Sequence, residues 1–133
     1  MKRFATVIIM MMVVAPPATL GFQGSVPRGP ILEPRDPERE KAALHNLEVA
    51  RFYFKKKKWT AVEKRLQEIV AEYPNFSQIA EVYFLLGEIY AKTDRRELAV
   101  ELYSRVVEEF PQSEFAQKAR ERLLELGDTA RQQ

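Results

Sequence analysis

Few side chains in this sequence of 133 residues have the chemistry that catalysis or metal binding requires. The chain has no cysteine and a single histidine, His45, so it lacks the material for disulfides, thiolate metal sites or a histidine relay. Its serines stand at 25, 77, 104 and 113, and none lies in the context of a nucleophile elbow. We interpret His45 as a helix-packing or hydrogen-bonding residue. The sequence therefore predicts a protein that is not an enzyme and that uses no metal or cofactor.

A run of four lysines, Lys55–Lys58, is the other chemically distinctive feature. Functionally, such a run could meet an anionic lipid head group, a nucleic-acid backbone or an acidic partner. However, four adjacent like charges repel one another, and the carboxylates of Glu63, Glu68 and Glu72 follow closely. We therefore interpret the run as a solvated turn between two helices.

The first 36 residues are expected to lie outside the folded domain. Lys2 and Arg3 precede an apolar run over 4–15, which is shorter than the roughly 20 residues of a membrane-spanning helix and typical of a secretory signal peptide. We assign 1–21 to this signal peptide, with an uncleaved anchor as the alternative, and the proline-containing stretch 22–36 to a disordered tether. The formal net charge of +2 equals the charge of those two basic residues, so no nucleic-acid partner is expected.

From residue 37 to 127, apolar residues spaced three and four apart predict a single all-α domain, and no segment shows the alternation of a strand. Residues 128–133 are expected to form a disordered tail. The expected helices are 37–56, which Asp36 caps; 59–73; one capped by Ser77; one that begins with a capping box of Asp94 and Glu97; and one that is capped by Ser113 and ends at Gly127.

The helices repeat at an interval of 37 residues, which aligns Pro74 with Pro111. Under this shift Tyr53 falls on Tyr90, Val62 on Ala99, Leu66 on Tyr103, and Ile69 on Val106. A helix pair that repeats at this interval is typical of a helical solenoid.

The second unit, 80–113, resembles the tetratricopeptide repeat. It has the residues of that motif at Tyr83, Leu86, Gly87, Tyr90, Ala99, Tyr103 and Pro111. Gly87 and Ala99 occupy the slots where the two helices of a unit approach most closely. The resemblance predicts a short tetratricopeptide-like solenoid of two helix pairs plus a terminal capping helix, whose outer side carries Lys118, Arg122 and Glu125.

A closer resemblance covers about residues 40–115 and is strongest in HNLEVARFYFKKKKWTAVEKRLQEIVAEYP, which spans 45–74. This segment resembles the C-terminal part of the BamD-type (YfiO-like) proteins of outer-membrane β-barrel assembly, although the lipid-bearing cysteine of that family is missing. The resemblance implies a scaffold at the periplasmic side of the outer membrane, with other β-barrel assembly subunits as partners. A Tol–Pal-type periplasmic tetratricopeptide coordinator and a self-associating repeat protein stay open as alternatives.

The expected binding surface is the concave face, which the first helix of each unit lines in a repeat solenoid. The predicted groove residues are Leu44, Leu47, Arg51, Phe54, Lys55, Glu81, Phe84, Glu88 and Lys92. Large apolar groups on a surface indicate a contact site, so Phe54 and Phe84 are expected to anchor a protein partner. Alternatively, the tether or the chain's own end covers the apolar members, or an upstream repeat would stack on them. A homodimer stays open, and membrane association is expected only indirectly or through an uncleaved N-terminal segment.

Overall fold

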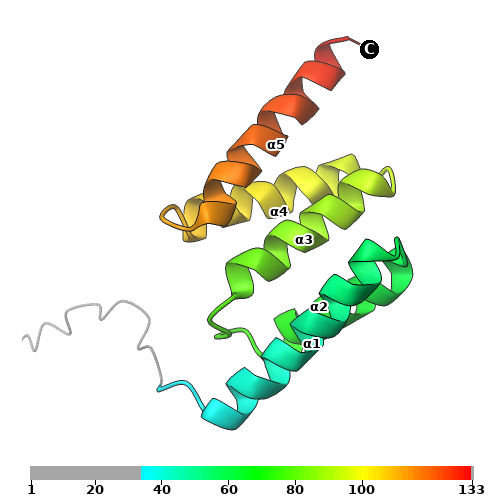
Figure 1. Ribbon diagram of the computed structural model, residues 1–133. Helices are drawn as coiled ribbons and strands as arrows, with labels where there is room; N and C mark the ends of the chain where they lie inside the picture. Colours follow the sequence, from blue (N-terminus) through cyan, green and yellow to red (C-terminus); the bar gives the residue numbers. More distant parts are fainter. Residues whose placement is uncertain (1–33, 133) are drawn as a thin grey trace, which may run out of the picture. The chain divides into compact units, whose positions relative to one another are not determined.

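The computed structural model describes residues 34–132, which form five α-helices and no strand (Figure 1). The helices are α1 (Pro37–Lys55), α2 (Trp59–Glu72), α3 (Ile79–Lys92), α4 (Arg96–Glu109) and α5 (Glu114–Arg131). The all-α prediction is confirmed. The proposed signal peptide at 1–21 and most of the proposed tether at 22–36 lie outside the described residues.

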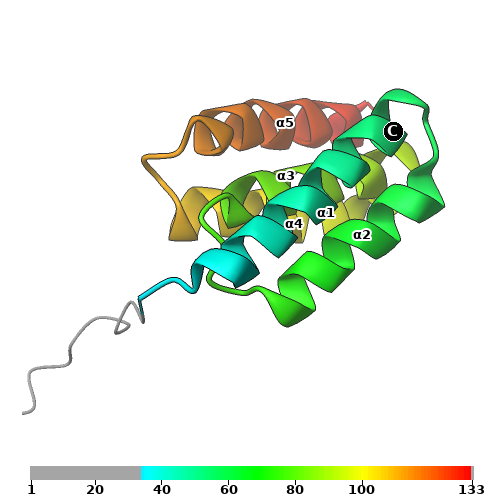
Figure 2. The ribbon, with the colours of Figure 1, turned by 60° about the horizontal axis from the view of Figure 1, so that its bottom comes forward.

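The helices pack as two antiparallel pairs, α1 with α2 and α3 with α4, and α5 then packs on α4 and α3. Figures 1 and 2 show that α1, α3 and α5 run in one direction, whereas α2 and α4 run in the opposite direction. This is the arrangement of a short tetratricopeptide-like solenoid with an additional terminal helix. The predicted fold is therefore confirmed at the level of helix order and pairing.

Two helix starts follow the sequence prediction because their capping interactions are local. The carboxylate of Asp36 accepts a hydrogen bond from the backbone N–H of Glu38 at 3.0 Å, and Pro37 occupies the first turn of α1. Likewise, the hydroxyl of Ser113 accepts a hydrogen bond from the backbone N–H of Phe115 at 3.2 Å at the start of α5.

The caps predicted at Ser77 and Asp94 are wrong. Residue 78 stands at the N-cap of α3, and the Ser77 hydroxyl instead donates to the carboxylate of Glu40, which also accepts from the Ser77 backbone N–H. Arg95 stands at the N-cap of α4 without a side-chain hydrogen bond. Asp94 lies in the turn before it in the left-handed region, with a φ of 62°.

The predicted end of the last helix at Gly127 is also wrong, because α5 continues to Arg131. Gly127 does not adopt the left-handed conformation that ends many helices, and it lies in open space. The Thr129 hydroxyl donates to the carbonyl of Glu125 at 2.9 Å, which continues the helical pattern past the glycine. Residues 128–131, which we assigned to a disordered tail, are therefore helical.

The close approach predicted at Gly87 and Ala99 is present in the second helix pair. Ala99 and Tyr103 of α4 are fully buried, and a Cβ added at Gly87 would lie 2.7 Å from the Tyr103 ring. Leu66 fills the Tyr103 slot in the first pair and is also fully buried. Glycine thus gives the tyrosine ring space that any larger residue would remove.

The run Lys55–Lys58 closes the first pair as predicted. Lys55 ends α1, the turn follows, and α2 begins at Trp59. Lys57 adopts the left-handed conformation with a φ of 57°, and all four lysines are exposed.

Candidate protein-binding site

Three of the nine predicted groove residues are buried rather than open. Leu47 is fully buried in the core, and Phe84 and Glu88 on α3 are only 9% and 8% exposed. The ring centroid of Phe84 lies 5.6 Å from that of Phe115 on α5 and 5.7 Å from that of Tyr103. The prediction of an open groove anchored by Phe84 is therefore wrong, because the last helix of the chain covers this ring.

Glu88 connects three helices rather than facing a partner. Its carboxylate accepts a hydrogen bond from the Tyr103 hydroxyl at 2.5 Å and from Nε of Arg122 on α5 at 2.8 Å. Burial, and then the hydrogen bond to this carboxylate, raise the pKa of Tyr103 far above its usual value. Arg122, which we expected on the outer side of the cap, therefore stabilises the seam between α5 and α3.

Arg51 and Glu81 form the corresponding seam between α1 and α3. Two parallel hydrogen bonds join Nε and Nη2 of Arg51 to the Glu81 carboxylate, at 2.7 and 2.6 Å. The hydrogen bond to this carboxylate raises the pKa of Arg51. The Arg51 side chain nevertheless keeps 40% of its surface exposed, so it is still accessible at the edge of the inner face.

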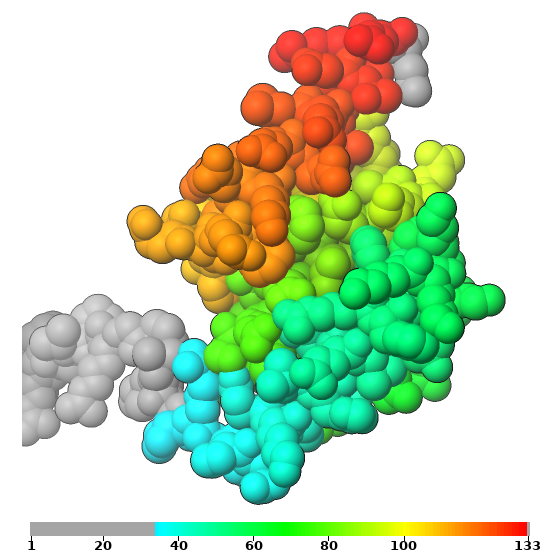
Figure 3. Space-filling model, viewed as in Figure 1, coloured from blue at the N-terminus to red at the C-terminus, as the bar shows by residue number. Residues whose placement is uncertain are grey.

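The other four predicted groove residues lie on α1 and at the end of α3. Leu44 and Phe54 are half-buried against the core, and the ring of Phe54 stands edge-on to Trp59 at 5.3 Å. Lys55 and Lys92 are exposed. In the space-filling view, a strip of α3 shows between α1 and α5 (Figure 3). The inner face therefore exists, but it is more polar than the sequence suggested.

A more apolar groove lies where α2, α3 and α4 meet, on residues that we had not selected. We call it the α2–α4 groove; it has a volume of about 300 Å³ and is lined by Gln67, Val70, Ala71, Tyr83, Leu86, Tyr90, Leu98, Glu101, Leu102 and Arg105. Leu98, at 43% exposed, is the most open leucine of this lining. Leu98 and Leu102 belong to the apolar spacing of α4, and such spacing does not show whether a neighbouring helix covers them.

Polar groups hold the rim of this groove in place. Nε2 of Gln67 donates to the Tyr90 hydroxyl at 3.3 Å, and the guanidinium of Arg105 lies 4.4 Å from the ring centroid of Tyr83. Nη1 and Nη2 of Arg95, at the start of α4, donate hydrogen bonds of 2.8 and 2.7 Å to the carboxylate of Glu63 on α2. The hydrogen bond from Arg95 lowers the pKa of Glu63. The groove is thus preformed between helices that are fixed to each other.

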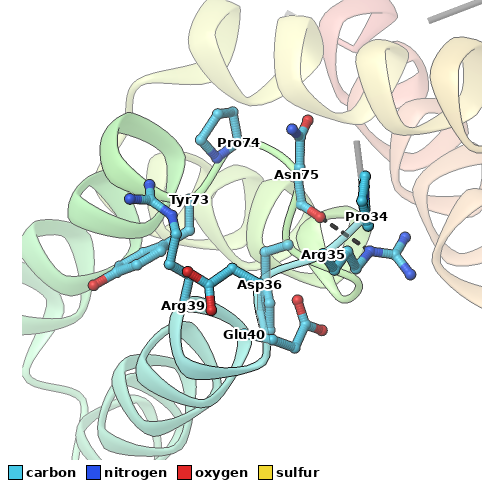
Figure 4. Close-up of a pocket in the computed structure, with 9 residues that line it drawn as sticks. Pro34, Arg35, Asp36, Arg39, Glu40, Tyr73, Pro74 and Asn75 are labelled. Carbon is cyan, nitrogen blue, oxygen red and sulfur yellow. Dashed lines mark hydrogen bonds between the residues drawn. The ribbon is translucent and has the colours of Figure 1, made fainter. Parts of the chain in front are cut away.

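A second pocket of about 350 Å³ lies where α1 begins beside the loop between α2 and α3 (Figure 4). Its walls are joined by specific hydrogen bonds. Nε of Arg35 donates to the carbonyl of Asn75 at 3.2 Å, and Arg39 donates to the carbonyl of Glu72 with its guanidinium over the Tyr73 ring. These groups are occupied by contacts within the chain, so we interpret this pocket as a polar joint between the two repeats.

Within residues 34–132 no group of three histidine, aspartate or glutamate side chains is placed to hold a metal ion. His45, which we expected to be a helix-packing or hydrogen-bonding residue, is exposed on α1, so it is not packed in the core. None of the helices described is long and apolar enough to cross a membrane.

Comparison with known proteins matches this helical region to one family. Residues 37–102 match the model of the YfiO family, described as an outer membrane lipoprotein. The outer membrane protein assembly factor BamD of Haemophilus influenzae (strain ATCC 51907 / DSM 11121 / KW20 / Rd) is 38% identical over 61 residues. This alignment covers 46% of the present chain and 23% of that protein, so the chain spans less than a quarter of the relative's length. The resemblance inferred from the sequence is thereby confirmed.

Proposed function

We propose that this chain, which is a BamD-like, YfiO-type repeat protein over residues 37–102, is a non-catalytic scaffold in outer-membrane protein assembly. The family match carries the proposal, because it begins at the first residue of α1 and extends into α4, so it includes both helices of the first repeat, all of α3 and the first half of α4. By the same argument we place the protein in the cell envelope, at the periplasmic side of the outer membrane.

The structure supports a binding role because its helices are fixed before any partner arrives. The Arg51–Glu81 and Arg122–Glu88 pairs join α1, α3 and α5, and Arg95–Glu63 joins α2 to α4. A preformed surface loses little conformational entropy when a partner binds, which favours affinity. A scaffold needs this property, and it needs no reactive group.

The α2–α4 groove is the surface that best fits a protein partner. Its apolar floor accepts one or two aliphatic or aromatic side chains from a helix or an extended segment, and Leu98 is the exposed member that such a segment reaches first. Gln67, Glu101 and Arg105 stand at its rim and set the register of the bound segment through hydrogen bonds. Of the residues predicted for the inner face, Arg51, Lys55 and Lys92 are still accessible for a second, polar contact.

The test is crosslinking of the full chain in cells of its native species, followed by identification of the captured proteins by mass spectrometry. We expect the wild-type chain to capture subunits of the β-barrel assembly machinery, and Leu98→Glu to lose most of that capture. Leu124→Glu is the matched control, because Leu124 is an exposed leucine on α5, 70% accessible and not a lining residue of the groove.

Each other outcome has a definite meaning. Capture of Tol–Pal components in place of assembly subunits would overturn the assembly role and favour a periplasmic coordinator. If only copies of the chain itself are captured, the protein is a self-associating repeat. If capture of assembly subunits falls equally in the Leu98 and Leu124 variants, the α2–α4 groove is not the binding surface. The assembly role would then still be supported by capture with the wild-type chain.

A further inference from the structure

The turn that closes the first helix pair carries an unusual density of positive charge. Lys55, Lys56, Lys57 and Lys58 are all exposed, and none has a carboxylate oxygen within 4.0 Å among residues 34–132. Lys92, at the end of α3, adds a fifth charge, because its Nζ lies 5.7 Å from the ring centroid of Trp59. Figure 1 shows the turns after α1 and after α3 at the same edge of the helical array. We call these five lysines, with Phe52 and Trp59, the basic edge.

Comparison of the two turns shows that the lysines are not required by the fold. Lys57 and Asp94 stand 37 residues apart, and both adopt the left-handed conformation, with φ values of 57° and 62°. Aspartate tolerates this conformation comparatively well, whereas lysine has no such preference. In the second turn Arg95, which occupies the slot of Lys58, is moreover paired with Glu63 at 2.7 Å. The first turn thus retains an unfavourable residue and leaves its charges without partners.

Aromatic side chains accompany the lysines. Phe52 is 53% exposed, and Nζ of Lys56 lies 4.6 Å from its ring centroid. Trp59 is half-buried and stands at the first residue of α2. Aromatic rings beside basic residues are the combination that binds at the interface between a membrane and water, because the rings enter the head-group layer while the cations meet lipid phosphates.

We propose that the basic edge binds the surface of a membrane that contains anionic phospholipid. The lysines contact the lipid phosphates, and Phe52 enters the head-group layer between them. A membrane fits better than a nucleic acid, because the exposed Phe52 ring beside Lys56 gains from partial burial in the head-group layer. This contact is separate from the α2–α4 groove, so it does not depend on the proposed assembly partner.

The experiment measures the partition of the full chain onto vesicles by co-sedimentation. One set contains phosphatidylcholine alone, and in the other about a third of the lipid is phosphatidylglycerol. The apolar stretch 4–15 gives any background on the neutral vesicles, so the measured quantity is the ratio of the two partition coefficients. The variant Lys56→Glu/Lys57→Glu is compared with Lys41→Glu/Arg120→Glu, which changes the net charge by the same amount at exposed positions elsewhere.

We expect the wild-type chain to prefer anionic vesicles, and this preference to fall about tenfold in the Lys56/Lys57 variant and to weaken as salt is added. Phe52→Ala should lower binding to anionic vesicles a few-fold. The Lys41/Arg120 control should keep most of the preference.

Three results would overturn the proposal. The first is a wild-type chain with no preference for anionic vesicles, and the second is an equal loss in the control variant, which would show an effect of net charge alone. The third is that the chain binds duplex DNA as tightly as it binds vesicles at equal phosphate concentration, and that Phe52→Ala leaves the DNA binding unchanged. This result would show a general polyanion site. Far-ultraviolet circular dichroism of each variant confirms that it is folded.

Discussion

The two helix pairs align at a shift of 37 residues, but the residues at equivalent core positions differ in chemistry. In the first pair, Ala50 and Leu66 are both fully buried in the core. In the second pair, the same slots hold Gly87 and Tyr103, and the tyrosine hydroxyl donates a hydrogen bond to the carboxylate of Glu88. The core slots of the first pair are therefore purely apolar, and the hydrogen bonds between α1 and α2 are exposed ones, from Arg39 to the Glu72 carbonyl and from Arg65 to Asn46 at 3.4 Å. The second adds a polar connection, because Glu88 also binds Arg122 and so fixes the terminal helix to the repeat.

The same comparison explains why the predicted groove is largely closed. Arg51 and Glu88 occupy equivalent slots, 37 residues apart, and each bonds to the next helix along the inner face. Arg51 binds Glu81 and Glu88 binds Arg122, so the charges are reversed but the geometry of the link is repeated. A slot that a longer array could use for a partner is used here to hold neighbouring repeats together.

The largest expected effect comes from filling the glycine slot of the second pair. Gly87→Ala places a Cβ 2.7 Å from the Tyr103 ring, and we expect it to lower the free energy of unfolding by about 2–3 kcal/mol. Adding Tyr103→Leu reproduces the Ala50–Leu66 pair, so the double variant should recover part of the loss. Urea unfolding monitored by circular dichroism gives the values, and a double-mutant cycle gives the coupling.

The matched control is Ala50→Gly in the first pair, which should cost only about 1 kcal/mol, since it removes a methyl group and adds backbone freedom. If Gly87→Ala is as stable as the wild type, the close approach of α3 and α4 does not limit the size of this residue. If Tyr103→Leu makes Gly87→Ala still less stable than the sum of the single changes, the ring is not the group that the new methyl meets.

A smaller loss of stability is expected from removing the hydroxyl group of Tyr103 in the second pair. Tyr103→Phe deletes the 2.5 Å hydrogen bond to Glu88 and should cost about 1.5 kcal/mol, since the acceptor is a buried carboxylate. Amide hydrogen exchange should become faster in α5 and stay unchanged in α1. Tyr83→Phe is the control, because no side-chain hydrogen bond of the Tyr83 hydroxyl exists within 34–132, and it should be nearly neutral. Equal acceleration in α1 and α5 would contradict a connection specific to the terminal helix.

Local rules predicted those parts of the fold that depend only on neighbouring residues. The apolar spacing gave the number and order of the helices, and Asp36 and Ser113 cap them because each reaches a backbone N–H two residues away. Ser77 failed as a cap because Glu40, on a different helix, binds its hydroxyl. That competition depends on how α1 meets the following repeat, which no local pattern contains.

The site was less predictable for the same physical reason. Repeat position predicted that Phe84 and Glu88 line an open inner face, but their exposure depends on α5, whose path was not predictable from periodicity. Conversely, Leu98 continues the apolar spacing of its helix, and only the structure shows that it is 43% exposed and lines the groove where α2, α3 and α4 meet. Periodicity predicts which face a residue takes, and it does not predict what covers that face.

A pH-dependent effect is expected at the ion pair that joins the two repeats. Arg95→Gln should cost about 0.5 kcal/mol at neutral pH, because the Arg95 and Glu63 side chains are 38% and 20% exposed. Since the hydrogen bond from Arg95 lowers the pKa of Glu63 from the ordinary 4.5, its stabilising effect is complete above that value and is lost as pH falls through the lowered pKa.

The difference between wild type and Arg95→Gln should therefore shrink to nothing in acid, which thermal unfolding at a series of pH values measures. Lys118→Gln breaks an exposed pair within α5, at 3.5 Å from Glu114, and should change stability by no more than about 0.3 kcal/mol. A difference between wild type and Arg95→Gln that stays constant into acid would mean that Arg95 acts through its packing on Tyr90, where its guanidinium lies 4.4 Å from the ring centroid.

The only stabilising effect is expected where the two turns differ. Lys57→Gly relieves the left-handed conformation at a φ of 57°, and after the entropy cost of glycine we expect a gain of about 0.5 kcal/mol. Asp94→Gly should gain less, because aspartate already tolerates its φ of 62°. Lys57→Gln removes the charge and keeps the backbone cost, so its stability should equal that of the wild type. If Lys57→Gln gains as much stability as Lys57→Gly, repulsion among the lysines, rather than the left-handed backbone, destabilises the first turn. Urea unfolding at low and high salt distinguishes the two causes, because salt screens only the repulsion.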